Sequence, residues 1–369
     1  MCFARAAFAL HLGQSREPGS EDSGERPPAS SQGYGSQSRP DRSFGKDFVD
    51  VTPTAPLVGR ADVLAARETI GGRVHRTPTL TSASLAREVG VPVYLKAELL
   101  QRTGSFKPRG VLNKLASLTA EEKSRGVIGI SAGNHAQALA YGAALEGVDA
   151  LIVMWQGVSE QKLEATKAYG GTVDLEAPDP LTAFDRLHQL VAETGRTLVH
   201  GFDDPDVIAG HGTIALELEE DAPDANVIVV PAGGGGLVSG IAAATDARVV
   251  AVEPEGSRAL HEGLRAGRPV TVSPTSIADG LSAPFAGENC IGVCLAWGVE
   301  SVLVSEAEIE AGFRFLYGRA KLACEPAGAV GLAALLAGKV PLSGASAVAV
   351  VVSGGNVAAE TAAAILAGR

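Results

Sequence analysis

One lysine in this sequence lies where a protein can use it as a neutral amine. Lys107 is part of the run 105–110 (SFKPRG), which follows a β-branched and aromatic run at 91–95 and precedes leucines at helical spacing. Pro108 suits a first helical turn, where its missing N–H costs nothing. We therefore expect Lys107 at a helix N-terminus, where the helix dipole disfavours its charge. Taken alone, a surface lysine in a loop is the simpler interpretation.

A run of four glycines forms a second candidate site, between a predicted strand at 227–230 and a predicted helix. The glycines are Gly233, Gly234, Gly235 and Gly236. Consecutive glycines let backbone N–H groups close around a phosphate, which favours a phosphate site over a plain tight turn. Counted from Gly234, the third glycine of a dinucleotide fingerprint is replaced by Ser239, and no Walker lysine follows. Glu253, at the end of the next strand, keeps a dinucleotide fold open as an alternative.

Two further turns between a predicted strand and a predicted helix carry polar side chains. The first, 131–135 (SAGNH), offers free N–H groups for a carboxylate, and the Asn134 amide can donate to a phenolate or carboxylate. The second, 353–356 (SGGN), places the Ser353 hydroxyl where it can bond a ring nitrogen without forcing its protonation. Each turn alone is more simply a helix cap, and His135 alone is more simply a structural histidine.

Together the four segments supply an amine for a Schiff base, a phosphate cradle, a carboxylate cradle and a partner for a ring nitrogen. These are the parts that a pyridoxal phosphate enzyme must provide. Strands of continuous Val, Ile and Ala alternate with helical patterns, which predicts an α/β fold with parallel sheets covered on both faces. Since right-handed crossovers place all carboxyl ends of strands at one edge, we expect the four segments to converge on one crevice.

The composition limits the class of protein. The chain has 369 residues, 46% of them apolar, which is enough for two domains with ample cores. A net charge of −11 without a long basic run argues against nucleic acid or an anionic membrane as partner. No apolar run is long and uncharged enough to span a bilayer. Cys290 and Cys294 resemble half of a metal site but lack a second pair, so we expect reduced thiols and a cytoplasmic protein.

These motifs resemble, in order and spacing, the four signatures of the fold type II pyridoxal phosphate enzymes. The resemblance rests on SFKPRG at 105–110, SAGNHAQ at 131–137, the glycine run, and SGGN at 353–356, and it extends from about Val58 to the C-terminus. Its nearest members are the threonine/serine dehydratases, or ammonia-lyases, and the related serine racemases. The cofactor that the resemblance implies is pyridoxal 5′-phosphate.

The resemblance also implies an architecture. It consists of two open, twisted, mostly parallel sheets flanked by helices, as in the β subunit of tryptophan synthase. A large cofactor-binding domain is expected at 51–125 and 204–369, with a smaller mobile domain inserted at 126–203. Residues 1–50 are expected to be a disordered tail, since the stretch from about Gln14 to Asp50 holds scarcely any apolar residues. A homodimer is the assembly that the resemblance suggests.

Roles toward the cofactor follow from the same resemblance. Lys107 would anchor it, with Phe106 stacked beside its ring. Asn134 would meet the ring hydroxyl and Ser353 the pyridine nitrogen. Gly233 to Gly236 would hold the phosphate. The residues expected to face a small amino-acid substrate are Ser131, Ala132, Gly133, His135, Asp279 and Glu325.

Two departures from the family pattern carry information. Racemases of this group have a serine at the position of Ala132, where it serves as acid and base on the face opposite the lysine. Alanine holds no proton there, which favours elimination with one base over racemisation. The divalent-cation site of some relatives uses carboxylates at the positions of Glu253 and Ala259, so the alanine leaves the metal undetermined.

The sequence therefore predicts a pyridoxal phosphate-dependent dehydratase that converts threonine, or serine, to a 2-oxo acid and ammonia, with Lys107 as its base. Three alternatives stay open. One is serine racemisation, and another is elimination from a bulkier β-hydroxy amino acid such as hydroxyaspartate or phenylserine. The third belongs to a different class, a non-catalytic nucleotide-binding protein.

Overall fold

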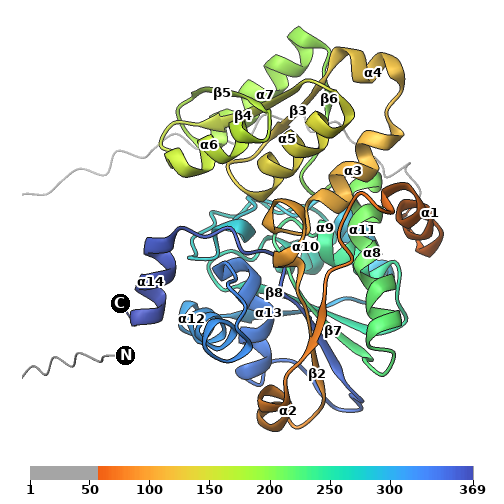
Figure 1. Ribbon diagram of the computed structural model, residues 1–369, viewed down its shortest axis with the longest axis vertical. Coiled ribbons are helices and arrows are strands. Elements are labelled where there is room, and N and C mark those ends of the chain that lie inside the picture. Colours follow the sequence, from red (N-terminus) through yellow and green to blue (C-terminus); the bar gives the residue numbers. More distant parts are fainter. Residues whose placement is uncertain (1–56, 369) are drawn as a thin grey trace, which may run out of the picture. The chain divides into compact units, whose positions relative to one another are not determined.

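The structure of the protein is a computed structural model that describes residues 57–368 (Figure 1). These residues form one six-stranded and one four-stranded sheet, both flanked by helices. All strand pairs are parallel except the pair at one edge of the larger sheet. The predicted α/β class with two mostly parallel sheets is thus confirmed. The tail expected to be disordered, 1–50, lies outside the described residues.

The larger sheet has the strand order β1-β2-β10-β7-β8-β9. The strands are β1 (Thr79–Thr81), β2 (Val93–Lys96), β7 (Val227–Pro231), β8 (Arg248–Pro254), β9 (Glu300–Val304) and β10 (Val348–Val351). The last strand of the chain, β10, pairs with β2 on one side and β7 on the other. This order brings the C-terminal turn beside segments that are far away in the sequence.

Both faces of the larger sheet are buried, which explains its uninterrupted apolar strands. In β7, Val227 and Val229 face the core that contains α12 (Glu306–Phe315) and α13 (Pro326–Leu336). Ile228 and Val230 face the core formed by α8 (Pro205–Asp221) and α9 (Gly236–Ala242). Figure 1 shows α12 and α13 on one side of these strands and α8 on the other.

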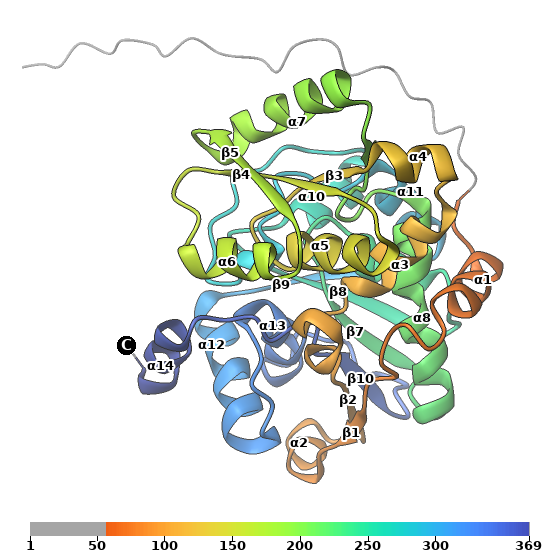
Figure 2. The ribbon, with the colours of Figure 1, turned by 45° about the horizontal axis from the view of Figure 1, so that its top comes forward.

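The smaller sheet has the order β5-β4-β3-β6, and all its pairs are parallel. Its strands are β3 (Val127–Ile130), β4 (Ala150–Trp155), β5 (Thr172–Ala177) and β6 (Thr197–Leu198). Figure 2 shows α7 (Pro180–Thr194) on one face, and α5 (Asn134–Glu146) and α6 (Glu160–Ala168) on the other. All elements of this sheet lie between residues 126 and 203, the range expected for the smaller domain.

Several elements differ from the sequence prediction or were not predicted. The helix expected at 212–220 begins seven residues earlier, because Asp204 caps it and Pro205 occupies its first turn. The helix expected at 306–321 ends at Phe315 and continues as the π-helical turn η4. The remaining elements are α1 (Arg60–Ile70), α2 (Ala83–Val89), η1 (Glu98–Leu100), η2 (Arg102–Gly104), α3 (Pro108–Ser117), α4 (Ala120–Arg125), α10 (Ala259–Ala266), η3 (Asp279–Leu281), α11 (Glu288–Ala296), η4 (Leu316–Ala320) and α14 (Ala359–Ala367).

The sequence prediction missed the first half of α8 because this half contains two glycines, and glycine disfavours a helix interior. Both are required by close packing. A Cβ atom on Gly210 would lie 2.4 Å from the Arg109 carbonyl oxygen, and one on Gly212 would lie 2.5 Å from that of Gly240. α8 therefore contacts α3 and α9 almost backbone to backbone. None of the helices within 57–368 combines the length and apolarity that crossing a membrane requires.

Candidate active site

Lys107 occupies the position immediately before α3, as predicted. The chain reaches it through η2, where Thr103 and Gly104 both have positive φ (59° and 74°). The Lys107 Nζ donates a hydrogen bond to the Gly201 carbonyl oxygen at 2.5 Å. Burial lowers the pKa of Lys107 to about 8, since a desolvated ammonium is disfavoured. The lysine is thus an amine that loses its proton close to neutral pH.

The lysine loop and the C-terminal SGGN turn lie side by side. Phe106 N donates to the Ser353 carbonyl oxygen at 3.1 Å, and Gly355 N donates to that of Gly104 at 2.9 Å. Ser105 and Gly354 form an isolated antiparallel bridge between the two segments. This contact follows from the sheet order, because β10, which leads into the SGGN turn, pairs with β2. Two of the four predicted segments therefore converge.

The asparagine loop joins them through side chains. Asn356 Nδ2 donates to Asn134 Oδ1 at 2.7 Å, and Asn134 Nδ2 donates to Glu325 Oε1 at 2.8 Å. Burial raises the pKa of Glu325 to about 8. Within 57–368, the Asn134 amide uses one of its two N–H donors in this way. The other remains for a ring hydroxyl, the contact that the family resemblance implies for Asn134.

The glycine run lies between β7 and α9, as predicted, and has no room for side chains. A Cβ atom on Gly234 would lie 2.4 Å from Cγ of Phe202, and one on Gly236 would lie 2.7 Å from the Phe202 carbonyl oxygen. Gly235 has φ +98°, a conformation that other residues rarely adopt. Phe202 follows Gly201, the residue that accepts the hydrogen bond from the lysine. The segment 201–202 thus connects the glycine cradle to Lys107.

Three neutral histidines surround the lysine. Burial, with the positive charge of Lys107 as a further cause, lowers the pKa of His135 to about 3 and lowers the pKa values of His200 and His211 as well. His135 Nε2 lies 2.9 Å from the Val199 carbonyl oxygen, and the His211 ring packs edge-on against Phe106 with ring centroids 4.7 Å apart. The His135 ring therefore has a backbone partner on the segment that follows β6.

The predicted substrate-side residues border the same loops. Ser131 Oγ accepts a hydrogen bond from Gly133 N at 3.1 Å, which shapes the turn before α5. Asp279 forms an ion pair with Lys162 at 2.6 Å, and both charges influence the pKa of the neighbouring Glu325. What these residues, together with Ala132 and His135, do for a substrate stays a prediction.

Sequence reasoning missed the segment 199–203 and the role of Asn356. Residues 199–203 contact His135, Lys107 and the glycine cradle, and Asn356 holds Asn134. The segment 199–203 could have been found from the sequence. The run HGFDD follows the strand β6, which is parallel to β3, so both strands have their carboxyl ends at the same edge of the sheet. Asn356 was visible in the SGGN motif, but its partner is 222 residues away.

Glu253 has a structural role in this chain. Its buried carboxylate accepts hydrogen bonds from Leu260 N (2.8 Å) and His261 N (2.7 Å) in the first turn of α10. Burial raises the pKa of Glu253 to about 8 despite these bonds. The part of the chain that the structure describes contains no group of three or more His, Cys, Asp or Glu side chains arranged for a metal. Glu253 therefore links β8 to the N-terminus of α10.

The profile of the family described as "Pyridoxal-phosphate dependent enzyme" matches residues 70–354. The chain belongs to this family. L-threonine ammonia-lyase of Thermotoga maritima is 42% identical over 308 residues, which cover 82% of this chain and 76% of that protein. The structure of maize serine racemase matches with a TM-score of 0.80 and 34% identity, covering 83% of this chain and 96% of that one. The processed form of threonine deaminase isoform 2 from Solanum lycopersicum matches with a TM-score of 0.76 and 30% identity, covering 84% and 92%.

The residues of this chain fit the family's cofactor. The glycine cradle excludes every side chain, as a pocket for a phosphate requires. A partly buried lysine with a lowered pKa offers an amine for the aldehyde. Within 57–368, the buried hydroxyl of Ser105, two residues before the lysine, has no hydrogen-bond partner. A buried polar group without a partner is costly, so a bound polar group is expected beside it.

The lowered pKa of Lys107 predicts how fast the cofactor attaches at different pH values. Only the neutral amine reacts with an aldehyde, so in cofactor-free protein the rate should rise as pH passes through about 8. An ordinary lysine has a pKa near 10.4, so exposed lysines should respond about two pH units higher. Brief exposure to pyridoxal phosphate, borohydride reduction and mass spectrometry of each lysine would measure this. A midpoint for Lys107 near 10 would contradict the prediction.

Proposed function

We propose that the protein is a threonine/serine dehydratase, an ammonia-lyase that converts threonine to 2-oxobutyrate and ammonia, and serine to pyruvate and ammonia. The observation that carries the proposal is an amine with a lowered pKa, Lys107, whose partner Gly201 precedes the residue that packs on the glycine cradle, and whose loop lies beside the turn that holds Asn134. The names of the relatives in Thermotoga maritima and Solanum lycopersicum support the same substrate class.

Each site segment has a task in this proposal. Gly233 to Gly236 hold the phosphate, Ser353 meets the ring nitrogen, and the backbone of 131–135 holds the substrate carboxylate. When bound, pyridoxal phosphate draws electrons from the substrate Cα and so makes its proton acidic. The neutral Nζ of Lys107 accepts that proton as general base. The low pKa of Lys107 leaves part of the amine unprotonated near neutral pH.

The opposite face of the substrate distinguishes elimination from racemisation. Racemisation needs a second group that returns a proton from the other side, and Ala132 offers none. Glu325, whose pKa burial raises to about 8, accepts a hydrogen bond from Asn134, which supports its proposed place on the substrate side. We infer that the α-proton leaves toward Lys107 and that the β-hydroxyl is then lost, with water released and ammonia freed on hydrolysis.

The test uses the cofactor-loaded protein with L-threonine and L-serine. Equal amounts of 2-oxo acid and ammonia are expected, without D-serine in a chiral assay. Phenylserine and 3-hydroxyaspartate serve as comparison substrates. D-serine as the main product would show a racemase, and faster turnover of a comparison substrate would change the assigned substrate. No product from any of the four would reject the proposal.

Three further features belong to this proposal. The range 126–203 is proposed to move as a smaller domain, supported by its separate four-stranded sheet and by one apolar core whose residues all lie within the range. A cytoplasmic location is supported by the three described cysteines, which are unpaired and buried. A homodimer rests on the family resemblance alone, and sedimentation of the purified protein would test it.

A further inference from the structure

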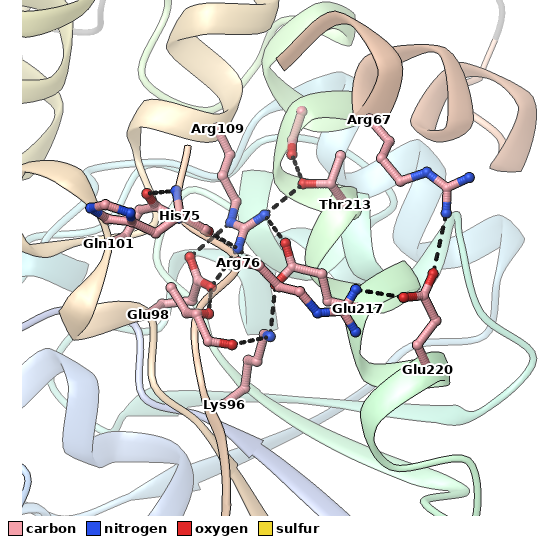
Figure 3. A network of polar contacts seen from close by, with 12 residues as sticks. Arg67, His75, Arg76, Lys96, Glu98, Gln101, Arg109, Thr213, Glu217 and Glu220 are labelled. Atoms are coloured by element: carbon pink, nitrogen blue, oxygen red, sulfur yellow. Dashed lines mark hydrogen bonds and ion pairs between the residues drawn. The ribbon is translucent and has the colours of Figure 1, made fainter. Parts of the chain in front are cut away.

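A network of buried charges includes a residue of the helix that follows the lysine loop (Figure 3). Its centre is Arg109, two residues after Lys107, whose side chain is 1% exposed. Lys96 and Glu98 are 0% exposed. The network connects β2, η1, α3 and α8, four elements that meet beside the candidate site. The roles assigned to the site so far do not use these side chains.

Two carboxylates, those of Glu98 and Glu217, bind Arg109 at once and form a clamp around its guanidinium. Its Nε and one terminal nitrogen donate to the two oxygens of Glu98, at 2.9 and 2.8 Å. Both terminal nitrogens donate to the two oxygens of Glu217, at 2.7 and 3.0 Å. The one remaining N–H group donates to Thr213 Oγ1 at 3.1 Å, and the His75 carbonyl oxygen, 3.3 Å from Nη2, is a third acceptor for that nitrogen. All five donors of the guanidinium are thereby used.

Lys96 completes the network. Its Nζ lies 2.7 Å from Oε2 of Glu217 and 3.5 Å from Oδ2 of Asp221. The same nitrogen donates to the Thr77 carbonyl oxygen at 2.7 Å. Glu217 therefore bridges Arg109 on α3 and Lys96 on β2. The carboxylate of Glu217 on α8 thus binds both β2, the strand that leads to the lysine loop, and α3, the helix that follows the loop.

The first turn of α3 depends on this clamp. Lys107 precedes the helix without a side-chain cap, so the turn is held by other contacts. Before the lysine, Phe106 N is bonded to the Ser353 carbonyl oxygen. After it, Arg109 N donates to the Phe106 carbonyl oxygen at 3.1 Å, and the Arg109 side chain reaches Glu98 and Glu217. The backbone of Lys107 is thus fixed from both sides.

Stability alone is a poor explanation for such a network. Removing charges from water costs so much that well-packed apolar side chains are often as stabilising as a buried ion pair. What a planar guanidinium between two carboxylates supplies is fixed geometry, because each bidentate pair sets both distance and orientation. The network is therefore suited to holding the lysine loop in place.

We propose that Arg109, bound by Glu98 and Glu217, is a positioning residue. It holds the first turn of α3, and thereby keeps the Lys107 amine at Gly201 and near the glycine cradle. The inference concerns the lysine that the proposed function uses as base, and it extends that function to a residue remote from the reacting atoms. It needs only that Lys107 binds the cofactor.

The decisive variant is Arg109→Lys, which keeps the charge but loses the planar fork. We expect a folded protein in which trapping of Lys107 by pyridoxal phosphate and borohydride at pH 8 slows about 100-fold, as displacement of a reacting group by about 1 Å produces. In the cofactor-loaded enzyme, kcat with threonine should fall similarly, while KM changes less than about threefold, since substrate contacts are untouched. Far-ultraviolet circular dichroism and the unfolding midpoint report folding.

Arg67→Met is the matched control. Arg67 of α1 forms an exposed ion pair with Glu220 (Figure 3). Glu220 lies on α8, as Glu217 does, but does not contact Arg109. Exposed pairs contribute little, so trapping and kcat should stay within about twofold of wild type. If Arg109→Lys behaves like this control in trapping and in kcat, Arg109 has no positioning role and the inference is wrong.

A second variant covers the case that Arg109→Lys does not fold. Glu217→Gln keeps the shape of the side chain and one acceptor oxygen. It removes the charge and so weakens one of the two carboxylate interactions of Arg109. It should fold and show a smaller loss of trapping than Arg109→Lys, and a wild-type rate would overturn the inference. Trapping requires no turnover. If the wild-type protein is trapped at Lys107 but forms no product from threonine or serine, the proposed dehydratase is rejected. The trapping rates of the variants still test the role of Arg109.

Discussion

Lys107→Ala is expected to abolish both covalent attachment of pyridoxal phosphate and turnover of threonine. The Lys107 amine is the group that bonds the cofactor and accepts the α-proton in the proposed function, and alanine can do neither. A general base alone contributes about 100- to 10,000-fold, and the cofactor anchor is lost with it, so the loss should reach or exceed the upper end of that range. Borohydride trapping with mass spectrometry and a 2-oxo acid assay measure the two effects.

Lys114→Ala is the control for this prediction. Lys114 lies on the same helix, α3, and forms ion pairs with Asp204 and Asp206 at the start of α8. Its loss should leave trapping at Lys107 intact. Specific, stoichiometric trapping at a different lysine in the Lys107→Ala protein would show that another residue carries the cofactor, and it would remove the central assignment.

Gly234→Ala is expected to weaken cofactor binding strongly. The new methyl group would lie 2.4 Å from Cγ of Phe202, closer than any unstrained contact. Overpacking of this kind costs about 1–3 kcal/mol, and when the strain falls on the bound conformation of the cradle, the dissociation constant rises about five- to 150-fold. Titration of cofactor-free protein, followed by absorbance, measures the change.

Two further variants decide whether the contact with Phe202 is the cause. Gly59→Ala is a matched glycine replacement, because no atom of the described chain lies within 4 Å of its Cβ position and its φ is −129°. It should bind the cofactor normally. Combining Gly234→Ala with Phe202→Ala removes the clash and should restore part of the affinity. An unchanged dissociation constant in Gly234→Ala itself would show that the glycine run does not form the phosphate cradle.

The fold class and the four site segments could be predicted from the sequence, because both depend on local patterns of residues. Strands buried on two faces must be apolar at successive positions, as Val227 to Val230 are. A proline after Lys107 and leucines at helical spacing mark the start of α3. The glycine run can be seen in the sequence because close packing requires it: a side chain on Gly234 or Gly236 would overlap Phe202. Each of these signals lies within a few consecutive residues.

Short or irregular elements were beyond sequence reasoning. The first half of α8 carries Gly210 and Gly212, which lower helix propensity but are required where α3 and α9 approach its backbone. The strands β1 and β9 are edge strands of three and five residues, only partly buried along most of their length, so they lack the continuous apolar pattern. Their formation depends on a neighbouring strand, which is a tertiary contact.

Which side chains contact one another could be read from the fold alone. Asn134 and Glu325 are 191 residues apart, and Arg109 and Glu217 are 108 apart. No local pattern encodes such pairs, because they follow from the insertion of β10 between β2 and β7 and from the packing of α8 against α3. The sequence could identify Lys107 as an amine with a special location. The fold decided that Gly201 accepts its hydrogen bond, that burial lowers its pKa, and that a clamped arginine lies behind it.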